Sequence, residues 1–413
     1  MNAPPDTATA ISNAAAVLGP GPLTEGGIAA HVAPLFSRVL ESNRDRAYLA
    51  NHSLGRPLDA TASDVAEAIG LWQSRLGDAW DAWSAEIAAY RARLARLVGA
   101  PRDDCIVPKT SAGQGLRTIL NSYARAPRVV ATRGEFDSID VILRQYARLG
   151  RIRLTLVEPC AHGLFAAEDV TRATSAGADL LVVSQVLFNT GQVLPELPSI
   201  IAAAHAAKAR VLVDIYHSLG VFPVDIEALD ADFAVGGSYK YLRGGPGAGY
   251  LYLHPRHLDG SLEPLDIGWF AKKDKFAYRR PNPPDFAPGG DAFLESTPPV
   301  LTYYQARAGQ IFAMAIGVGR LREYSLAQQR RLVSLLAERG VAASGGTSDR
   351  GAFVTVDFER FGDGSATQCA GALAQRGIVC DARGPWLRLC PDILTTVHEL
   401  ERAAASIAQA IGV

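Results

Sequence analysis

Short apolar segments alternate with helical segments along the middle of the chain, and this alternation constrains the fold more than any other feature. The apolar segments include PRVVAT, RIRLTLVE, ADLLVVSQV, RVLVDIYH and ADFAVGGSYKY, and helical spacing recurs at 138–149, 166–176 and 198–208. Continuous apolar strands joined by helices are typical of a mostly parallel sheet with helices on both faces. GAGYLYL follows SYKY too closely for a helical crossover, so we expect it to pair antiparallel with its neighbour.

The regions on either side of this core have other patterns. Residues 61–98 carry apolar positions at helical spacing, whereas 259–300 is rich in proline and glycine and predicts a long ordered loop or a subunit contact. A helical region follows from 301 to about 339. Three apparent strands in GAFVTVDF, GIVCDARG and WLRLCP, and a last helix over 396–411, predict a second, small α+β layer.

We therefore expect three parts: a flexible N-terminal lead-in over 1–30, a large domain over 61–300, and a smaller α+β domain formed by 31–60 together with 301–413. The two outer segments are grouped because both flank the alternating core. The N-terminus has no basic residues before its alanine-rich stretch, which makes it a poor secretory signal.

Composition narrows the class of protein. Lysine plus arginine (41) nearly cancels aspartate plus glutamate (42), which gives no electrostatic reason to expect nucleic acid or an anionic membrane as partner. No apolar window is long enough to predict a membrane span. The five cysteines are scattered without a CxxC pair, so we expect neither disulfides nor a metal site. A cytoplasmic enzyme is the resulting expectation.

Three ionisable residues stand where two apolar strands end: Asp214 and His217 in VDIYHSLG, and Lys240 in GGSYKY. Ligands of open parallel sheets bind beyond the carboxyl ends of the strands. Taken singly, these residues have ordinary interpretations as a helix cap, a partly buried histidine and a solvated lysine. Small residues before Lys240, however, would let a bulky ligand approach, and apolar or cationic surroundings lower a lysine pKa toward Schiff-base chemistry.

A phosphate site is indicated by TSAGQG at 110–115, which opens a helix and offers free backbone N–H groups. The segment matches neither GxGxxG nor a P-loop, which disfavours dinucleotides and ATP. A phosphate cradle, an acid for a pyridinium, an aromatic ring for stacking and a lysine for an imine together suit pyridoxal 5′-phosphate. Asp214 would keep the ring nitrogen protonated, because a nearby opposite charge favours the charged form.

VDIYHSLG followed by SYKYL resembles the fold-type I pyridoxal-phosphate enzymes of the class V aminotransferase superfamily and, within it, the kynureninases. The resemblance covers about 45–400 through further motifs in the expected order: YLANHSLGRP, EFDSID, NTGQ, GWF, STPP and VCDARGPWLRLCP. It implies the fold-type I architecture, with a large, mostly parallel sheet flanked by helices and a smaller α+β domain. It also implies a homodimer whose active site is completed by the neighbouring subunit.

The resemblance assigns catalytic roles to the matching residues. Lys240 would form the Schiff base with the cofactor and later shuttle protons, and Asp214 would pair with the pyridine nitrogen with support from His217. Tyr239 would donate a proton during catalysis. Arg388 would clamp the substrate α-carboxylate, for which a bidentate guanidinium is well shaped.

The resemblance also implies how the cofactor is held. Phe136 would stack on the ring, and Ser184 would lie near it. The phosphate would be bound by Thr110, Ser111, Ser138 and Tyr239, with Trp269 and Thr297 reaching the phosphate of the neighbouring subunit's cofactor.

The chain departs from the family pattern at several positions. Ile139 stands in place of the aspartate of the Phe-Pro-Ser/Thr-Asp motif, and Gly113 stands where an asparagine is usual. Ala271 and Lys272 replace a Gly-His pair after GWF, and Thr297 replaces an asparagine of the animal enzymes. The Schiff-base residues are thus intact, while parts of the substrate-facing shell differ.

The leading functional hypothesis is a kynureninase-type hydrolase of tryptophan catabolism, which cleaves the Cβ–Cγ bond of L-kynurenine or a related γ-keto amino acid. The alternative is another class V activity on a different amino acid, by an aminotransferase, a lyase or an epimerase. A cysteine desulfurase is disfavoured because Cys369, Cys380 and Cys390 fall on an apparent helix and strands, as small buried side chains do. A catalytically inactive binding module is a third hypothesis, opposed by the retained Asp214 and Lys240.

Overall fold

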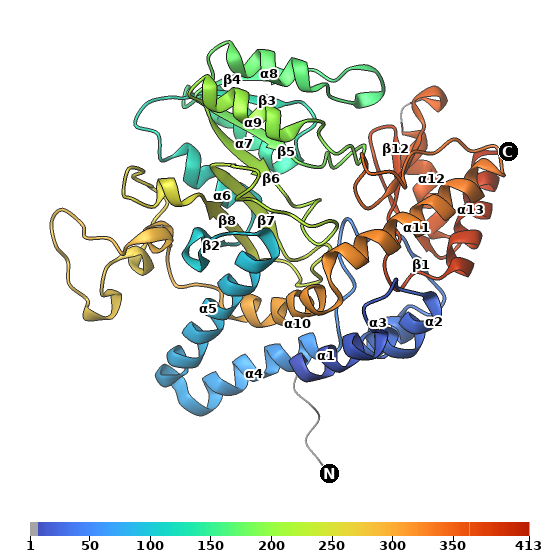
Figure 1. Ribbon diagram of the computed structural model, residues 1–413, viewed down its shortest axis with the longest axis horizontal. Helices are drawn as coiled ribbons and strands as arrows, with labels where there is room; N and C mark the ends of the chain where they lie inside the picture. The colour runs from blue at the N-terminus through green and yellow to red at the C-terminus, as the bar shows by residue number, and fades with distance from the viewer. Residues whose placement is uncertain (1–6, 363, 413) are drawn as a thin grey trace.

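A seven-stranded sheet forms the centre of the molecule in the computed structural model, which describes residues 7–362 and 364–412. The spatial order of its strands is β2-β8-β7-β6-β5-β3-β4 (Figure 1). The strands are β2 (Ile106–Lys109), β3 (Arg128–Thr132), β4 (Arg153–Val157), β5 (Leu180–Ser184), β6 (Arg210–Asp214), β7 (Phe233–Gly237) and β8 (Gly249–Leu253). The α/β fold expected from the alternating segments is confirmed.

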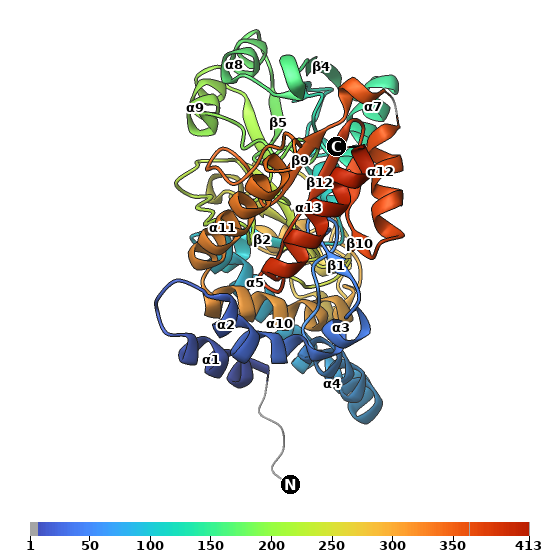
Figure 2. The ribbon, with the colours of Figure 1, turned by 90° about the vertical axis from the view of Figure 1, so that its right-hand side faces the viewer.

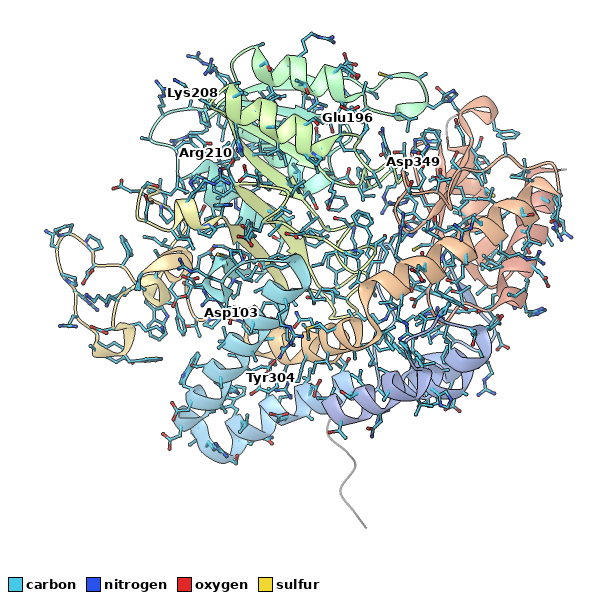
Figure 3. All side chains as sticks on the ribbon, in the orientation of Figure 1. Asp103, Glu196, Lys208, Arg210, Tyr304 and Asp349 are labelled. Atoms are coloured by element: carbon cyan, nitrogen blue, oxygen red, sulfur yellow. The ribbon has the colours of Figure 1, made fainter. Side chains whose placement is uncertain are left out.

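Strand direction brings the key residues to one edge of the sheet. β3 to β7 run parallel, with Ser184 opposite Asp214 and Asp214 opposite Val235 in the register. β8 is antiparallel to both β7 and β2, as expected for the short GAGYLYL connection. Arg210 begins β6 and Lys208 lies just before it (Figure 3), whereas Asp214 ends the strand.

Helices bury both faces of this sheet. Alternate strand residues point to opposite faces, so Val213 packs in one apolar cluster and Leu212 in another. The first cluster lies under α5 (Ala79–Val98), α8 (Ala167–Ser175), α9 (Leu197–Ala206) and α10 (Val300–Ile316). The second lies under α6 (Ala112–Leu120) and α7 (Asp137–Arg148). α4 (Ala60–Arg75) packs against α10 and α5.

The C-terminal part has a sheet and a core of its own. Its antiparallel strands lie in the order β11 (Asp381–Arg383), β12 (Trp386–Leu389), β9 (Val354–Asp357), as the three apparent strands predicted. The short strand β10 (Ile378–Val379) pairs in parallel with β1 (Ala47–Tyr48) from the N-terminal part. Around them pack α11 (Val318–Ala337), α12 (Ser365–Ala374) and α13 (Val397–Ile411) (Figure 2).

The long helical region expected from 301 is two helices. Gly317, with φ of 89°, separates α10 from α11. A positive φ is accessible to glycine at little cost, so the chain turns there. α10 stays against the large sheet while α11 joins the C-terminal core, and the two parts of the molecule are therefore connected through this turn.

The N-terminal segment differs from the flexible lead-in expected over 1–30. Helix α1 spans Thr7–Leu18, and α2 (Glu25–Gly27) and α3 (Ser37–Ser42) follow it. Ile11 is buried against an apolar cluster that includes Phe36 and Phe312. The alanine-rich sequence has high helix propensity, and one apolar face gives it a surface to pack. Residues 1–6 of the expected lead-in lie outside the described residues.

The proline-rich segment after β8 is a long ordered excursion. It contains the single helical turns Trp269–Ala271, Lys275–Ala277 and Gly289–Phe293, and its last turn lies beside β2.

Within residues 7–362 and 364–412, no helix combines the length and apolar character that crossing a bilayer requires.

A buried ion cluster ties three distant segments together. Asp392 lies between Arg56, at 3.3 Å, and Arg243, whose Nη2 donates to the other carboxylate oxygen. All three side chains are less than 10% exposed. Burial alone would raise the pKa of Asp392, but the two guanidinium groups hold it below its usual value. The cluster thus joins the N-terminal segment and the C-terminal part to the loop after Lys240.

We predict that Asp392→Asn destabilises the protein by about 3–5 kcal/mol, because it leaves two buried guanidinium groups without their counter-charge. Urea unfolding monitored by circular dichroism measures the loss. Glu41→Gln is the matched control, since Glu41 and Arg44 form an exposed ion pair (side chains 78% and 70% exposed). Equal unfolding midpoints for the two variants would contradict the prediction.

Candidate active site

A cavity of about 400 Å³ lies at the carboxyl ends of the central strands. Nine of the twelve residues expected at the site line it: Thr110, Ser111, Phe136, Ser138, Ser184, Asp214, His217, Tyr239 and Lys240. The three that do not are Trp269, Thr297 and Arg388. The fold therefore brings together residues that are up to 130 positions apart in the sequence.

Lys240 follows β7 and is 5% exposed. Its Nζ lies 2.5 Å from Nε2 of His217 and 5.4 Å from the ring centroid of Phe136. Burial lowers the pKa of Lys240 to about 7, although the negative charge of Asp214 opposes the shift. A large fraction of the amine is consequently neutral near pH 7, which is the nucleophilic form needed for a Schiff base.

Asp214 ends β6 and accepts a hydrogen bond from the backbone N–H of Tyr216 at 2.8 Å. Burial raises the pKa of Asp214 to about 6, against this hydrogen bond and the charge of Lys240. His217, expected to support Asp214, instead lies against Lys240, with its Nδ1 3.2 Å from the hydroxyl of Tyr241. Burial and the charge of Lys240 hold the pKa of His217 well below its usual value, so the imidazole is neutral.

Gly236 and Gly237 precede Lys240, and the sequence predicted that these small residues leave space for a bulky ligand. A Cβ on Gly236 would lie 2.3 Å from the Tyr250 hydroxyl, and one on Gly237 would lie 2.4 Å from the Tyr216 ring. These glycines make room for tyrosine side chains of the protein rather than for the ligand itself. Tyr216 in turn forms part of the cavity wall.

The phosphate-type cradle is present at the start of α6. Ser111 is the N-cap, and its hydroxyl accepts from the backbone N–H of Gln114 at 3.2 Å. Thr110 donates through its backbone N–H and its hydroxyl to Oε1 of Gln114, at 2.6 and 3.0 Å. These groups and the helix N-terminus favour an anion at this end of the cavity.

Arg388 on β12 lies behind the cavity wall and is 2% exposed. Its Nε and Nη2 donate to the carboxylate of Asp381 at 2.8 and 2.6 Å, and its Nη1 donates to the carbonyl of Phe188. Asp381 also accepts from Ser53 at 2.7 Å, and Ser53 and Phe188 both line the cavity. Arg388 is thus connected to the cavity directly through the lining residue Phe188 and indirectly, through Asp381, to the lining residue Ser53.

Trp269 and Thr297 lie on the long excursion after β8. The indole Nε1 of Trp269 donates to the hydroxyl of Thr297 at 3.2 Å. Thr297 lines an adjoining cavity of about 370 Å³ that shares Thr110 with the first. Their expected contact with a neighbouring subunit's phosphate stays a prediction.

Two of the departures from the family pattern lie in the protein interior. Ile139 is fully buried in the apolar cluster under α7, and so it does not face the cavity. A Cβ on Gly113 would lie 2.8 Å from Cδ1 of Ile142, so a larger residue there would require the end of the Ile142 side chain to move. The sequence-based interpretation of Ile139 as part of the substrate-facing shell is therefore wrong.

Sequence reasoning missed several residues of the site. Phe188 and Tyr216 form aromatic walls of the cavity; Phe188 directly precedes the motif NTGQ, and Tyr216 lies inside VDIYHSLG. His52 is buried, with its Nε2 2.7 Å from Asp381, and Glu135 is buried directly before Phe136. His52 lies inside the motif YLANHSLGRP and Glu135 inside EFDSID, so the sequence places both in recognised motifs. That both side chains are buried is shown only by the fold.

The profile of the family described as aminotransferase class-V matches residues 58–403. The chain belongs to the class V aminotransferase family. Its relatives in this family include the kynureninase of Deinococcus radiodurans, 30% identical over 357 residues, which are 83% of each chain. The kynureninase of Salinispora tropica is 31% identical over 403 residues, covering 89% of this chain and 90% of the relative.

Solved structures with the same fold include cysteine desulfurases and a cystine C-S lyase. A C-DES mutant with glycine covalently linked to its PLP cofactor has a TM-score of 0.79 at 21% identity, covering 91% of this chain and 98% of that chain. The cysteine desulfurase CsdA of Escherichia coli has a TM-score of 0.77 at 19% identity, over 93% and 98% of the two chains. These likenesses confirm the fold-type I architecture.

The cavity residues fit pyridoxal phosphate. A helix N-terminus, a buried acid, an aromatic ring and a partly neutral lysine converge on one space, and these are the groups this cofactor requires. Thr110 and Ser111 would hold the phosphate, Phe136 would face the ring, and Asp214 would pair with its nitrogen. Lys240 would provide the covalent link.

We predict that the rate of pyridoxal phosphate uptake by the cofactor-free protein rises with pH up to about 7 and then levels off, because Lys240 is already neutral above its lowered pKa. Stopped-flow absorbance between about pH 5.5 and 9.5 measures this rate. Nα-acetyl-lysine is the control, whose rate should continue to rise across the whole range. A protein rate that climbs in parallel with this control would contradict the prediction.

Proposed function

We propose that this chain is a pyridoxal-phosphate-dependent hydrolase of the kynureninase type, acting on L-kynurenine or a related γ-keto amino acid. The cofactor assignment follows from the family and from structural relatives that carry this cofactor. In the proposed reaction, water adds to the γ-carbonyl carbon and the Cβ–Cγ bond breaks. A proton then replaces the acyl group on Cβ, and the products are alanine and anthranilate.

The observation that carries the proposal is the similarity to kynureninases over most of both chains. It exceeds 80% of the length of this chain and of the two relatives described above, with identities of 30% and 31%. The structural neighbours described as cysteine desulfurases or as the cystine C-S lyase C-DES have lower identities, from 18% to 21%. The sequence relation therefore favours the hydrolase, and the fold relation is common to all of these enzymes.

The residues of the cavity can supply the proton transfers of this reaction. The bound cofactor would act as an electron sink for the substrate α-carbon. Lys240, with a pKa of about 7, can take a proton from that carbon and return it near neutral pH. Tyr239 keeps its proton because burial raises its pKa to about 12, so it can serve as a proton donor.

Arg388 can bind a carboxylate without losing its present partners. A guanidinium has five N–H donors, and the contacts with Asp381 and Phe188 use three of them. The remaining two are the donors that a substrate α-carboxylate would use in the bidentate arrangement that arginine favours. Because Arg388 is 2% exposed and does not line the cavity, the substrate would reach them only if the cavity wall moves. Asp381 would hold the guanidinium in one orientation before the substrate arrives.

A second candidate function is another class V activity on a different amino acid, such as transamination, elimination or epimerisation. It is favoured by the replaced residues Lys272 and Thr297 in the long excursion and by structural relatives that include a cystine C-S lyase. Desulfuration has less support, because none of the five cysteines is among the residues lining the cavity. Cys369 and Cys390 are buried as expected, and Cys380 is half-buried.

A homodimer and a cytoplasmic location complete the proposal. The resemblance places Trp269 and Thr297 at the neighbouring subunit's cofactor, and the ring of Phe276, which is 49% exposed, packs against Trp269 with ring centroids 5.7 Å apart. Sedimentation velocity of the holoprotein tests the dimer directly.

We predict that the purified holoprotein converts L-kynurenine to equimolar anthranilate and alanine, and that Lys240→Ala abolishes both products. Anthranilate fluorescence and amino-acid chromatography measure the products, and the visible band of the cofactor reports its attachment. Retention of the band without any product from kynurenine would leave the fold and cofactor standing and would reject this substrate. Transamination or elimination of other amino acids would then support the second candidate.

We also predict that Arg388→Lys raises KM about tenfold or more while kcat changes less, since a lysine cannot make the bidentate contact. Steady-state kinetics with the accepted amino acid measure both constants. Arg383→Lys is the matched control, because Arg383 lies 3.7 Å from the same Asp381 but is largely exposed (side chain 44%). A similar KM for the two variants would remove Arg388 from substrate binding.

A further inference from the structure

A second buried acid lies next to the cofactor cavity. Glu135 is in the turn between β3 and α7 and is 3% exposed. Both of its carboxylate oxygens accept hydrogen bonds from hydroxyls: Oε1 from Thr132 and Oε2 from Ser184, each at 2.6 Å. Since Ser184 lines the cavity, Glu135 is connected to the cofactor space through one hydroxyl group.

The surroundings of Glu135 place its pKa near neutral pH, so that it can gain or lose a proton there. Burial raises its pKa to about 7, against the two hydroxyl hydrogen bonds, and the negative charge of Asp214 on β6 raises it further. The cations of its own turn and helix are occupied elsewhere, because Arg133 pairs with Glu158, Arg144 pairs with Asp140, and Arg148 donates to Gln145. Glu135 therefore has hydroxyl partners but no ion-pair partner within the described residues.

The proton on Glu135 determines what Ser184 offers to the cavity. When Glu135 is ionised, Ser184 donates its only proton to Oε2 and presents lone pairs to the cavity. When Glu135 is protonated, its own proton can be donated to Ser184, whose hydroxyl then becomes free to donate into the cavity. Thr132 is less suited to accept that proton, because its Oγ1 already accepts from the backbone N–H of Gly134 at 3.2 Å.

We propose that Glu135 is a positioning residue for the cofactor ring, acting through Ser184. In the ionised state it makes Ser184 an acceptor beside Asp214, its neighbour in the strand register. An acceptor at this position favours a protonated, cationic ring. The proposal rests on pyridoxal phosphate occupying the cavity and is independent of which amino acid is the substrate.

A thermodynamic cycle tests this proposal without any turnover. Wild type, Glu135→Gln, Ser184→Ala and the double variant are freed of cofactor, and the dissociation constant of pyridoxal phosphate is measured by tryptophan fluorescence at about pH 6 and pH 8. The loss of affinity caused by Glu135→Gln should be about threefold larger at the higher pH, where Glu135 is ionised, and should show no such increase in the Ser184→Ala background.

Two further measurements separate positioning from a purely structural role. A structural role would lower the thermal unfolding temperature of the cofactor-free Glu135→Gln protein, with the same loss of cofactor affinity at both pH values. Glu158→Gln is the matched control, since Glu158 directly follows β4, is exposed and pairs with Arg133 of the turn that holds Glu135. A pH-independent loss, or one that persists without Ser184, would overturn the proposal.

If Glu135→Gln does not fold, Ser184→Ala alone decides the matter. Relative to wild type, its loss of cofactor affinity should be larger at about pH 8 than at about pH 6, since the acceptor is then missing. Equal losses at both pH values would reject the role of Ser184 as the intermediary. A complete failure of every variant and wild type to bind pyridoxal phosphate would instead reject the cofactor assignment, which is a distinct outcome.

Discussion

The site depends above all on the burial of the Lys240 amine, which lies at the carboxyl ends of the parallel strands β5, β6 and β7. Lys240 is placed where water is scarce, and a lone ammonium there would carry a large desolvation cost. The neighbouring Asp214 offsets part of that cost, and a pKa near 7 removes much of the remainder by letting the amine lose its proton. His217, kept neutral by the same burial, adds a polar contact without adding charge.

The site combines side chains from two separately packed regions. The lysine and the acid come from the large sheet, whereas Arg388 comes from the small C-terminal sheet. Asp381 links them, because it accepts hydrogen bonds from Arg388 and from Ser53 of the N-terminal segment, and Ser53 lines the cavity. A relative shift of the two regions would therefore move Arg388 away from the cavity that holds Lys240 and Asp214 while leaving each region locally intact.

Much of this organisation could be predicted from the sequence, since it depends on local patterns. The alternation of strands and helices, the antiparallel pairing of β8 and the cofactor are confirmed. Nine of the residues expected from the motifs line one cavity. The errors concern tertiary packing. Whether Gly237 faces a ligand or Tyr216, whether Ile139 faces the substrate or the core, and whether Ile11 finds an apolar surface depend on neighbours far away in sequence. Glu135 was overlooked because burial of a charged residue has no local signal.

The antiparallel strand β8 has a consequence for how such a site could be rebuilt. Because β8 reverses direction between β7 and β2, two reversals cancel and β2 again points toward the edge that holds Asp214. The direction of β2 relative to β7 depends on the number of antiparallel pairings between them. An even number leaves β2 parallel to β7 and keeps the start of α6 at the edge of Asp214, whereas an odd number would place it at the other edge. With a single reversal, α6 would start at the opposite edge, roughly one strand length or about 16 Å from the lysine. Any circular permutation or strand transplant of this scaffold must keep that count even.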